Sequence, residues 1–336
     1  MYFQSVICYN VEKCRIGEYD MIIYFSKVNL VSTKLLEAYK DERMLSEIRR
    51  NILSYLKSGT IYEVQDFRID EQGKSYPVTT RYRLTIGMKA DDYISGVIYK
   101  TTTLYYKKLN DNTEEVESHS IPTIEDVKFY FDINREIVGF HTRNRFGYRE
   151  FNDAIAGIIN MCMEKNNSQL RFAAELYNEG ISIKEIHKEL AEIPNIKRLE
   201  FKFSLPNPAD DEMLAELKDG LTETALQLEE ANANAMSVIF DSDGGVGLNI
   251  DSGEIKRNIE RVGKLTNGVS DTEATQNGYA RVIALAKDGK RYTTEEQKPV
   301  KREIDDESDE SFFRACRDTI LTIIAKKTTH KQQQME

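Results

Sequence analysis

The sequence lacks any long hydrophobic run. Across its 336 residues, no apolar stretch approaches the roughly 20 residues that a membrane-spanning helix requires. The N-terminus also lacks a basic segment followed by an apolar one, the pattern of a secretory signal. We therefore expect a cytoplasmic protein without membrane insertion.

Cysteine and histidine are scarce, with four of each. The cysteines show no Cys-x-x-Cys spacing, which argues against a zinc site and favours reduced thiols. The dispersed histidines form no recognisable Ser/His/Asp or Cys/His set. We expect no metal and no cofactor; an enzymatic activity stays open but is not favoured.

A positive charge excess is also missing, since 46 Lys and Arg face 56 Asp and Glu, for a net charge of −10. The balance is uneven along the chain. Residues 1–150 hold 22 basic and 22 acidic residues, which leaves 46 − 22 = 24 basic and 56 − 22 = 34 acidic residues for the rest. A surface that binds a polyanion is therefore more plausible in the first half.

The first half reads as sheet-rich. After short strand-like runs at 6–9 and 19–25, apolar spacing over residues 33–57 predicts an amphipathic helix. Alternating segments rich in Tyr, Thr, Val and Ile then predict an antiparallel meander at 60–70, 76–89, 96–109, 124–133 and 136–141. We expect a β-rich domain over 6–145 with one long helix.

In the second half, strands and helices alternate. Helices are predicted at 148–163, 182–190, 208–231, 252–266 and 311–326, and strands at 170–177, 196–205, 236–241, 278–287 and 291–294. Ser182 is the expected N-cap, with Glu185 completing a capping box. The predicted fold class is thus α+β, with a layered β/α domain over 146–326. The acidic stretch 298–310 is predicted to be an exposed linker, and 327–336 a disordered tail.

The densest basic and aromatic cluster lies at the domain junction, in Phe140–Arg149. Its arginines could bind the phosphates of a nucleic acid while one of its aromatic side chains stacks on a base. Grooves that bind nucleic acid with little sequence preference are built in this way. The alternative is a solvated turn whose aromatics pack on the next helix. Residues on the same side of the meander strands could extend the face. The candidate residues are Arg143, Arg145, Phe146, Tyr148, Arg149, Arg81, Arg83, Lys107 and Lys108.

Three motifs are weaker. Glu200-Phe-Lys202 matches half of a metal-dependent nuclease site, with Asp241 or Asp243 as further carboxylates, but simple strand alternation explains it better. Residues 176–190 open like a helix-turn-helix, yet a strand follows where the recognition helix is needed. The glycines in 241–251 match no phosphate-binding motif, which favours a tight strand-to-helix connection.

The stretch Lys197-Arg-Leu-Glu-Phe-Lys-Phe-Ser-Leu-Pro-Asn-Pro-Ala-Asp210, followed by the long helix and by Gly278-Tyr-Ala-Arg-Val-Ile-Ala, resembles an uncharacterised bacterial family of mobile and phage-defence gene neighbourhoods. The chain is more loosely similar to the lambda Rex abortive-infection sensor and to the B component of the Kiwa system. These resemblances imply dimeric, DNA-engaging defence proteins. We therefore expect an anti-phage component that binds nucleic acid, DNA in preference to RNA, or a phage nucleoprotein, as sensor or adaptor, with a possible partner defence protein. A metal-dependent nuclease and a protein-interaction subunit of a larger complex stay as alternatives.

Overall fold

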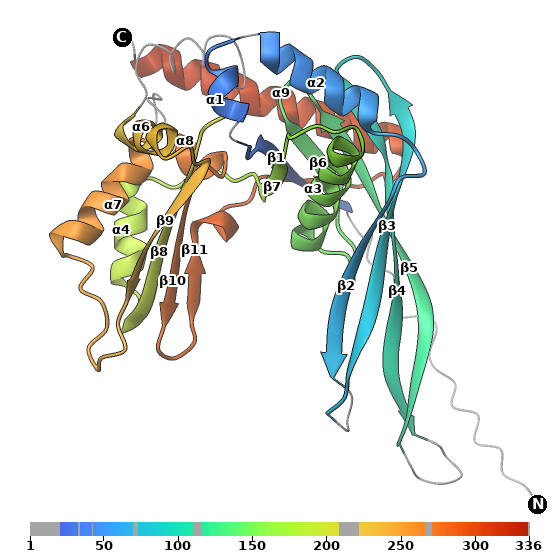
Figure 1. Cartoon of the computed structure of the whole chain (residues 1–336), viewed down its shortest axis with the longest axis horizontal. Coiled ribbons are helices and arrows are strands. Elements are labelled where there is room, and N and C mark those ends of the chain that lie inside the picture. Colours follow the sequence, from blue (N-terminus) through green and yellow to red (C-terminus); the bar gives the residue numbers. More distant parts are fainter. Residues whose placement is uncertain are drawn as a thin grey trace, which may run out of the picture.

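The structure, a computed structural model, describes residues 21–334 except 33, 42, 70–72, 110–115, 208–221 and 266–270. The fold is α+β, as the sequence predicted. Two antiparallel sheets lie side by side, with helices packed around them (Figure 1). Among the described residues, none of the helices combines the length and hydrophobicity that crossing a bilayer requires.

The larger sheet contains eight strands in the order β12-β1-β6-β5-β4-β3-β2, and β7 also pairs with β1. Its strands are β1 (Met21–Leu30), β2 (Ile61–Ile69), β3 (Ser75–Lys89), β4 (Tyr93–Leu109), β5 (Val116–Asp132), β6 (Ile137–His141), β7 (Phe172–Leu176) and β12 (Lys301–Ile304). β2 to β6 form the predicted meander.

Strands from the second half of the chain complete this sheet. β12 pairs with the start of β1 and β7 with its end, both on the edge opposite β6. The predicted linker at 298–310 therefore contains a paired strand, which the sequence missed because its charged residues conceal a short edge strand. The division near residue 145 stays a prediction, but the two chain halves share one sheet.

The β2–β3 and β4–β5 hairpins extend from the body as two arms (Figure 1). β3 and β4 pair from Lys89 and Ile94 to Arg81 and Thr101, and beyond that point each hairpin continues separately. The β4–β5 pairing reaches Leu109 and Val116.

The larger sheet has two faces with different neighbours. The inner face carries Tyr82, Leu84 and Ile98, which pack in one core with α2 (Arg43–Tyr55) and α3 (Tyr148–Lys165). The outer face meets α9 (Asp309–Gln334), whose buried residues share a core with Phe25 of β1 and Tyr130 of β5. The backbone of α9 stays helical past residue 326, where the tail was predicted to begin.

The predicted helix over 33–57 is interrupted. The chain forms α1 (Lys34–Ala38) and then α2, with a turn between them. Tyr39 in this turn is buried, and its hydroxyl donates to the carbonyl oxygen of Pro206. Tertiary contact therefore overrides the continuous helical spacing.

The smaller sheet has the order β11-β10-β8-β9. Its elements are β8 (Ile196–Ser204), β9 (Ala235–Asp241), β10 (Ala280–Ala286) and β11 (Arg291–Thr293), with α4 (Ile183–Ala191), α6 (Glu223–Glu230), α7 (Gly253–Gly263), α8 (Glu273–Gln276) and η2 (Thr294–Glu296). α4 and α7 pack on one face (Figure 1). The predicted capping box of Ser182 and Glu185 opens α4. Most of the predicted helix at 208–231 lies outside the described residues.

Candidate nucleic-acid interface and an adjoining cleft

The predicted Arg143–Arg149 cluster forms a tight turn between β6 and α3. Arg143 and Phe146 exchange backbone hydrogen bonds across it, at 3.1 and 3.0 Å. Phe146 is fully buried, with its ring 5.7 Å from that of Tyr82 and 6.3 Å from that of Phe151. The expectation that Phe146 stacks on a base is therefore wrong, because its ring belongs to the core. The alternative, in which this aromatic packs on the following helix, is correct.

Tyr148 and Arg149 are also engaged within the protein. Tyr148 is half-buried and stacks on Tyr24 of β1, with ring centroids 6.1 Å apart. The Arg149 guanidinium lies 5.8 Å from the Tyr148 ring centroid and pairs with Glu296 of η2. Arg149 thus links α3 to η2, which follows the smaller sheet. A ligand would have to displace Glu296 from the Arg149 guanidinium.

Lys100 fixes the same turn from the inner face. Its ammonium group donates to the carbonyl oxygen of Arg145 and, at 2.7 Å, to the carboxylate of Glu150. The Tyr82 hydroxyl donates to the other Glu150 oxygen at 2.6 Å. Lys100 is 9% exposed, so it is a structural cation and not a solvated charge. The Arg145 side chain is exposed.

Arg81 and Arg83 lie on the outer face, because they alternate with Tyr82 along β3. Arg81 pairs with Glu63 at 2.7 Å. Arg83 is exposed and has no acidic partner in the described part of the chain. The predicted strand residues therefore lie on the face opposite Lys100 and Phe146. The side chains of Lys107 and Lys108 lie outside what the structure describes.

Arg143 joins Arg83 on the outer side. Its guanidinium lies near His141, whose ring contacts Phe312 of α9 at 6.3 Å. Burial, and next the charge of Arg143, lower the pKa of His141 to about 4. Like Arg83, Arg143 has an exposed side chain with no ion pair among the described residues.

Tyr99 lies beside Arg83 on the neighbouring strand of the sheet. Arg83 of β3 is the register partner of Tyr99 of β4, which is in turn the partner of Asp126 of β5. Tyr99 is 37% exposed. We call Arg83, Tyr99 and Arg143 the outer-face row. Sequence reasoning missed Tyr99, because only the strand register brings it beside Arg83.

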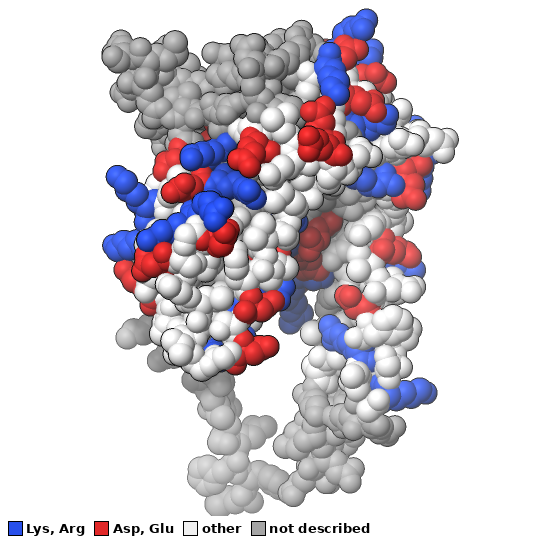
Figure 2. All heavy atoms as spheres, turned by 60° about the vertical axis from the view of Figure 1, so that its left-hand side comes forward, with Lys and Arg blue, Asp and Glu red and all other residues white. Residues whose placement is uncertain are grey.

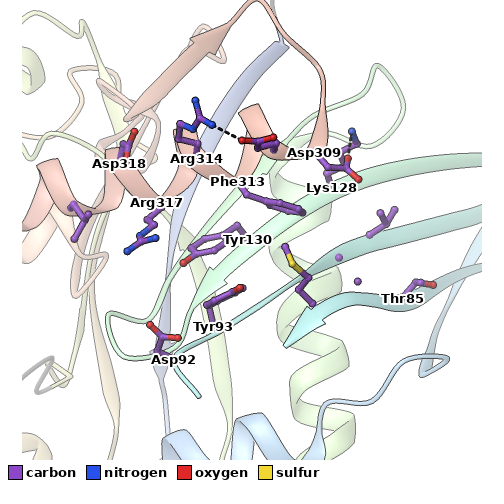
Figure 3. A pocket seen from close by; sticks show the side chains of 16 residues that line it. Thr85, Asp92, Tyr93, Lys128, Tyr130, Asp309, Phe313, Arg314, Arg317 and Asp318 are labelled. Carbon is purple, nitrogen blue, oxygen red and sulfur yellow. Dashed lines mark hydrogen bonds and ion pairs between the residues drawn. The ribbon is translucent and has the colours of Figure 1, made fainter. Parts of the chain in front are cut away.

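A cleft of about 1010 Å³ adjoins the row, between α9 and the outer face of β3 to β5 (Figure 3). Its floor includes Gly87 and Gly96, where the β3–β4 register shifts between Ile86 and Met88. A side chain at position 96 would place its Cβ against the backbone oxygen of Thr85, so this floor requires glycine. The bulge thus leaves open space next to α9.

Aromatic rings form one wall of the cleft. Tyr93 and Tyr130 stack with centroids 5.1 Å apart, and Phe313 of α9 lies 6.5 Å from Tyr130. Tyr130 is nearly buried, whereas Tyr93 and Phe313 are half-exposed. Burial, and then the charges of Asp132 and Asp92, raise the pKa of the Tyr130 hydroxyl to about 12. Tyr130 is therefore a neutral phenol at physiological pH.

Charged groups surround these rings. Lys128 pairs with Asp309 and Arg314 with Glu310, each at 2.6 Å. Two other groups at the cleft, Arg317 of α9 and Asp92 before β4, form no ion pair within the described residues. Figure 3 shows the Arg317 side chain directed toward Tyr130, with Asp92 beyond Tyr93.

A half-buried ionic group lies where the two sheets meet. Arg281 of β10 pairs with Glu175 of β7 and, at 3.4 Å, with Glu295 of η2. Burial, with a smaller contribution from the nearby Glu295, raises the pKa of Glu175 to about 7 against the opposing charge of Arg281. Sequence reasoning gave no sign of this group, since its members come from three distant segments.

The proposed nuclease residues do not assemble. Leu199, Phe201 and Phe203 are buried, while Glu200 accepts a hydrogen bond from Ser237 at 3.3 Å on the opposite side of β8. Asp241 pairs with Arg198 at 3.0 Å instead of approaching Lys202. No three His, Cys, Asp or Glu side chains within the described ranges are grouped to hold a metal ion.

The other two motifs follow the simpler interpretation. α4 leads into β8, so no recognition helix follows it. In the glycine-rich connection after β9, Gly247 has a φ of +79°, and a Cβ there would lie 2.8 Å from the Cα of Asn195. This glycine is needed for close backbone packing.

Fold and site together define an α+β protein with an open, arginine-bearing sheet face and an aromatic cleft beside it. The chain belongs to the family described as "Domain of unknown function (DUF4747)", whose profile matches residues 72–321. The matched part includes the outer-face row and the cleft residues. No curated protein matched the sequence.

Proposed function

We propose that this protein binds nucleic acid on the outer face of its larger sheet, without turnover, as a sensor or adaptor in anti-phage defence. The outer-face row carries the proposal: it combines an exposed tyrosine with two exposed arginines that form no ion pair among the described residues. The defence setting, and DNA in preference to RNA, rest on the sequence resemblance alone.

The chemistry of the row suits a nucleic-acid strand. Guanidinium groups bind phosphate oxygens with two parallel hydrogen bonds, and a tyrosine ring accepts any base by stacking. Neighbouring strands lie about 4.8 Å apart, so side chains on β3, β4 and the end of β6 span a distance comparable to a few nucleotides.

The overall charge of −10 opposes this binding. Asp126 of β5, the register partner of Tyr99, adds a negative charge beside the row. We therefore expect modest affinity with marked dependence on salt, since phosphate contacts release counterions.

The test is fluorescence anisotropy with labelled single-stranded and double-stranded DNA and RNA over a salt series. Arg83→Ala and Arg143→Ala should each weaken binding about 5- to 10-fold and lower the salt slope by about one. The control is Arg257→Ala, because Arg257 is an exposed arginine on α7 that pairs with Glu254. Binding that is absent at low salt, or equal in all three variants, contradicts the proposal.

A protein partner is the second candidate, and exposed apolar side chains on the two hairpins favour it. Ile61, Phe67 and Ile69 of β2 are 45, 72 and 73% exposed, and Ile124 of β5 is 69% exposed. Strand alternation and register place all four on the outer face. Exposed apolar side chains gathered on one face are typical of protein interfaces. A second copy of the chain or a partner defence protein would bury them.

Analytical ultracentrifugation and co-purification test this alternative. The double variant Phe67→Ser, Ile69→Ser should abolish self-association or partner capture while leaving nucleic-acid affinity unchanged. A wild-type protein that sediments as a monomer and captures nothing would refute a role for the arm in either kind of assembly.

A further inference from the structure

The cleft beneath α9 contains features that the outer-face row does not need. Its volume of about 1010 Å³ lies at the upper end of the roughly 300–1000 Å³ typical of small-molecule sites. Its lining combines half-exposed aromatic rings with a few charged groups that converge from different elements. This combination is the one that fixes small polar aromatic ligands in proteins.

The rings offer a stacking surface. Tyr130 contacts Tyr93 on one side and Phe313 on another, so the three rings form one aromatic wall. The half-exposed rings of Tyr93 and Phe313 present apolar area to the cleft, beside Met88 and Leu321, which are 45 and 44% exposed. A planar heterocycle would cover this area without displacing a side chain.

Some charged groups at the cleft form ion pairs, and others do not. Lys128 and Arg314 are neutralised by Asp309 and Glu310. Arg317 offers a cation, and Asp92 an acceptor, without ion-pair partners in the described part of the chain. The ligand should therefore carry an anionic group for Arg317 and hydroxyl or amino donors for Asp92, joined to an aromatic ring.

We propose that this cleft binds a nucleotide. Its base lies against Tyr93 and Phe313, its phosphate binds Arg317, and a ribose hydroxyl or base amino group donates to Asp92. A nucleotide carries these three groups in one molecule, and the cleft volume accommodates one or two nucleotide units. The site stands apart from the proposed nucleic-acid face: the outer-face row could fail to bind while the cleft still binds.

Calorimetric titration of the full chain tests the site. The probes are the four 5′-mononucleotides, the matching nucleosides, inorganic phosphate and free tyrosine, each at up to about 1 mM. At least one mononucleotide should bind more tightly than its nucleoside and than phosphate. Absence of mononucleotide binding overturns the proposal, as does phosphate binding as tight as that of the nucleotide. Preferential binding of tyrosine would assign the cleft to amino acids or peptides and would also overturn it.

Variants locate the ligand. Arg317→Ala should lower mononucleotide affinity about 10-fold and leave nucleoside affinity unchanged, since a charged hydrogen bond to phosphate is lost. Tyr93→Leu should weaken nucleotide and nucleoside alike. The matched control is Arg314→Ala, one turn away on α9 and already paired with Glu310. Equal losses for Arg314→Ala and Arg317→Ala contradict the assignment.

Two further binding experiments distinguish the possible sources of the nucleotide, which are a strand end and a free nucleotide. An oligonucleotide with a 5′-phosphate is compared with one that lacks it, and with the free mononucleotide. If the cleft holds a strand end, the phosphorylated oligonucleotide binds more tightly in an Arg317-dependent manner; if it holds a free nucleotide, the two oligonucleotides bind equally. Arg83→Ala and Arg143→Ala should not change mononucleotide affinity, so failure of the row and failure of the cleft are distinguishable.

Discussion

At the scale of single residues, Asn207 ties the smaller sheet to the larger one. It lies just after β8, and its buried amide faces the backbone of Leu30 at the end of β1, with the amide oxygen 2.6 Å from the N–H nitrogen and the amide nitrogen 3.0 Å from the carbonyl oxygen. The Tyr279 hydroxyl donates to its backbone oxygen at 3.1 Å. The stretch that carries the sequence resemblance therefore contains an anchor between sheets.

Replacing this amide should be costly. Asn207→Ala leaves the N–H and C=O groups of Leu30 buried without partners, and we expect a loss of about 2–4 kcal/mol in the free energy of unfolding. Urea denaturation measures it. Asn144→Ala, at an exposed position in the turn before α3, is the control and should change stability by less than about 0.5 kcal/mol. Similar small effects from both substitutions would show that Asn207 is not an anchor.

The raised pKa of Glu175 predicts that the free energy of unfolding decreases as pH rises. Its pKa rises from 4.5 to about 7 on folding, chiefly because the side chain is buried. Between these values the folded protein keeps a proton that the unfolded chain has lost, so this group's contribution to stability falls as pH rises. Below the window and above it, the contribution is constant.

The Glu175→Gln variant isolates this contribution, because glutamine stays neutral throughout. Between about pH 5 and about pH 8, the wild type should lose up to roughly 3 kcal/mol relative to the variant. Urea midpoints at the two pH values give the difference. Glu192→Gln, at an exposed site after α4, should behave as the wild type. A parallel decline in Glu175→Gln would mean that other groups set the pH dependence.

At the scale of elements, the β3 bulge shapes the cleft. Gly96 of β4 lies so close to Thr85 of β3 that any Cβ would approach its backbone oxygen to 2.0 Å. The register between β3 and β4 shifts between Ile86 and Met88, on either side of Gly87. The close approach of the two strands at Gly96, next to this register shift, thus shapes the cleft floor.

Gly96→Ala should force the strands apart, with a cost of about 1–3 kcal/mol and a loss of nucleotide binding in the cleft. Thermal unfolding and calorimetric titration check the two effects. Gly245→Ala is a suitable control, since nothing lies within 4 Å of the added methyl group. Unchanged stability in Gly96→Ala would contradict the close approach of β3 and β4.

At the scale of the whole molecule, β1 organises both chain halves. Its residues pair with β6 on one edge and with β12 and β7 on the other. Phe312, Cys316 and Ile320 of α9 complete the core over its outer side. The first half by itself would leave one edge of β1 unpaired and this core uncovered.

A fragment of residues 21–145 should therefore fail to fold cooperatively. We expect poor dispersion of its amide resonances and no sharp thermal transition, in contrast to the full chain. The loss of β7, β12 and α9 removes both hydrogen bonds and apolar burial from β1. A well-dispersed spectrum from the fragment would instead support an autonomous N-terminal domain.

Local pattern was enough to predict most elements. Alternation of Leu199, Phe201 and Phe203 marked β8 and its buried side, and the spacing of Ser182 and Glu185 marked the start of α4. It also favoured strand alternation over a nuclease site at Glu200 and Lys202. These features depend on neighbours in sequence, which periodicity records.

The candidate site was only partly predictable. The sequence pointed to Arg83 and Arg143, but it grouped them with Phe146, which is buried, and it omitted Tyr99. It gave no indication of the cleft, whose wall joins Tyr93, Tyr130 and Phe313 from β4, β5 and α9. Alternation along a strand determines the face of the sheet on which a side chain lies. The side chains beside it depend on the register between strands, which a single sequence does not show.

The amino-acid sequence by itself thus determined the α+β class, the order of helices and strands, and the alternation that exposes Arg83. Only the tertiary structure decided that β7 and β12 complete the first sheet, that Lys100 is buried beneath the turn at Arg145, and that α9 closes over the outer face. The physical reason is that these contacts join residues far apart in the chain, and their energy comes from shared burial and hydrogen bonding, which no local pattern encodes.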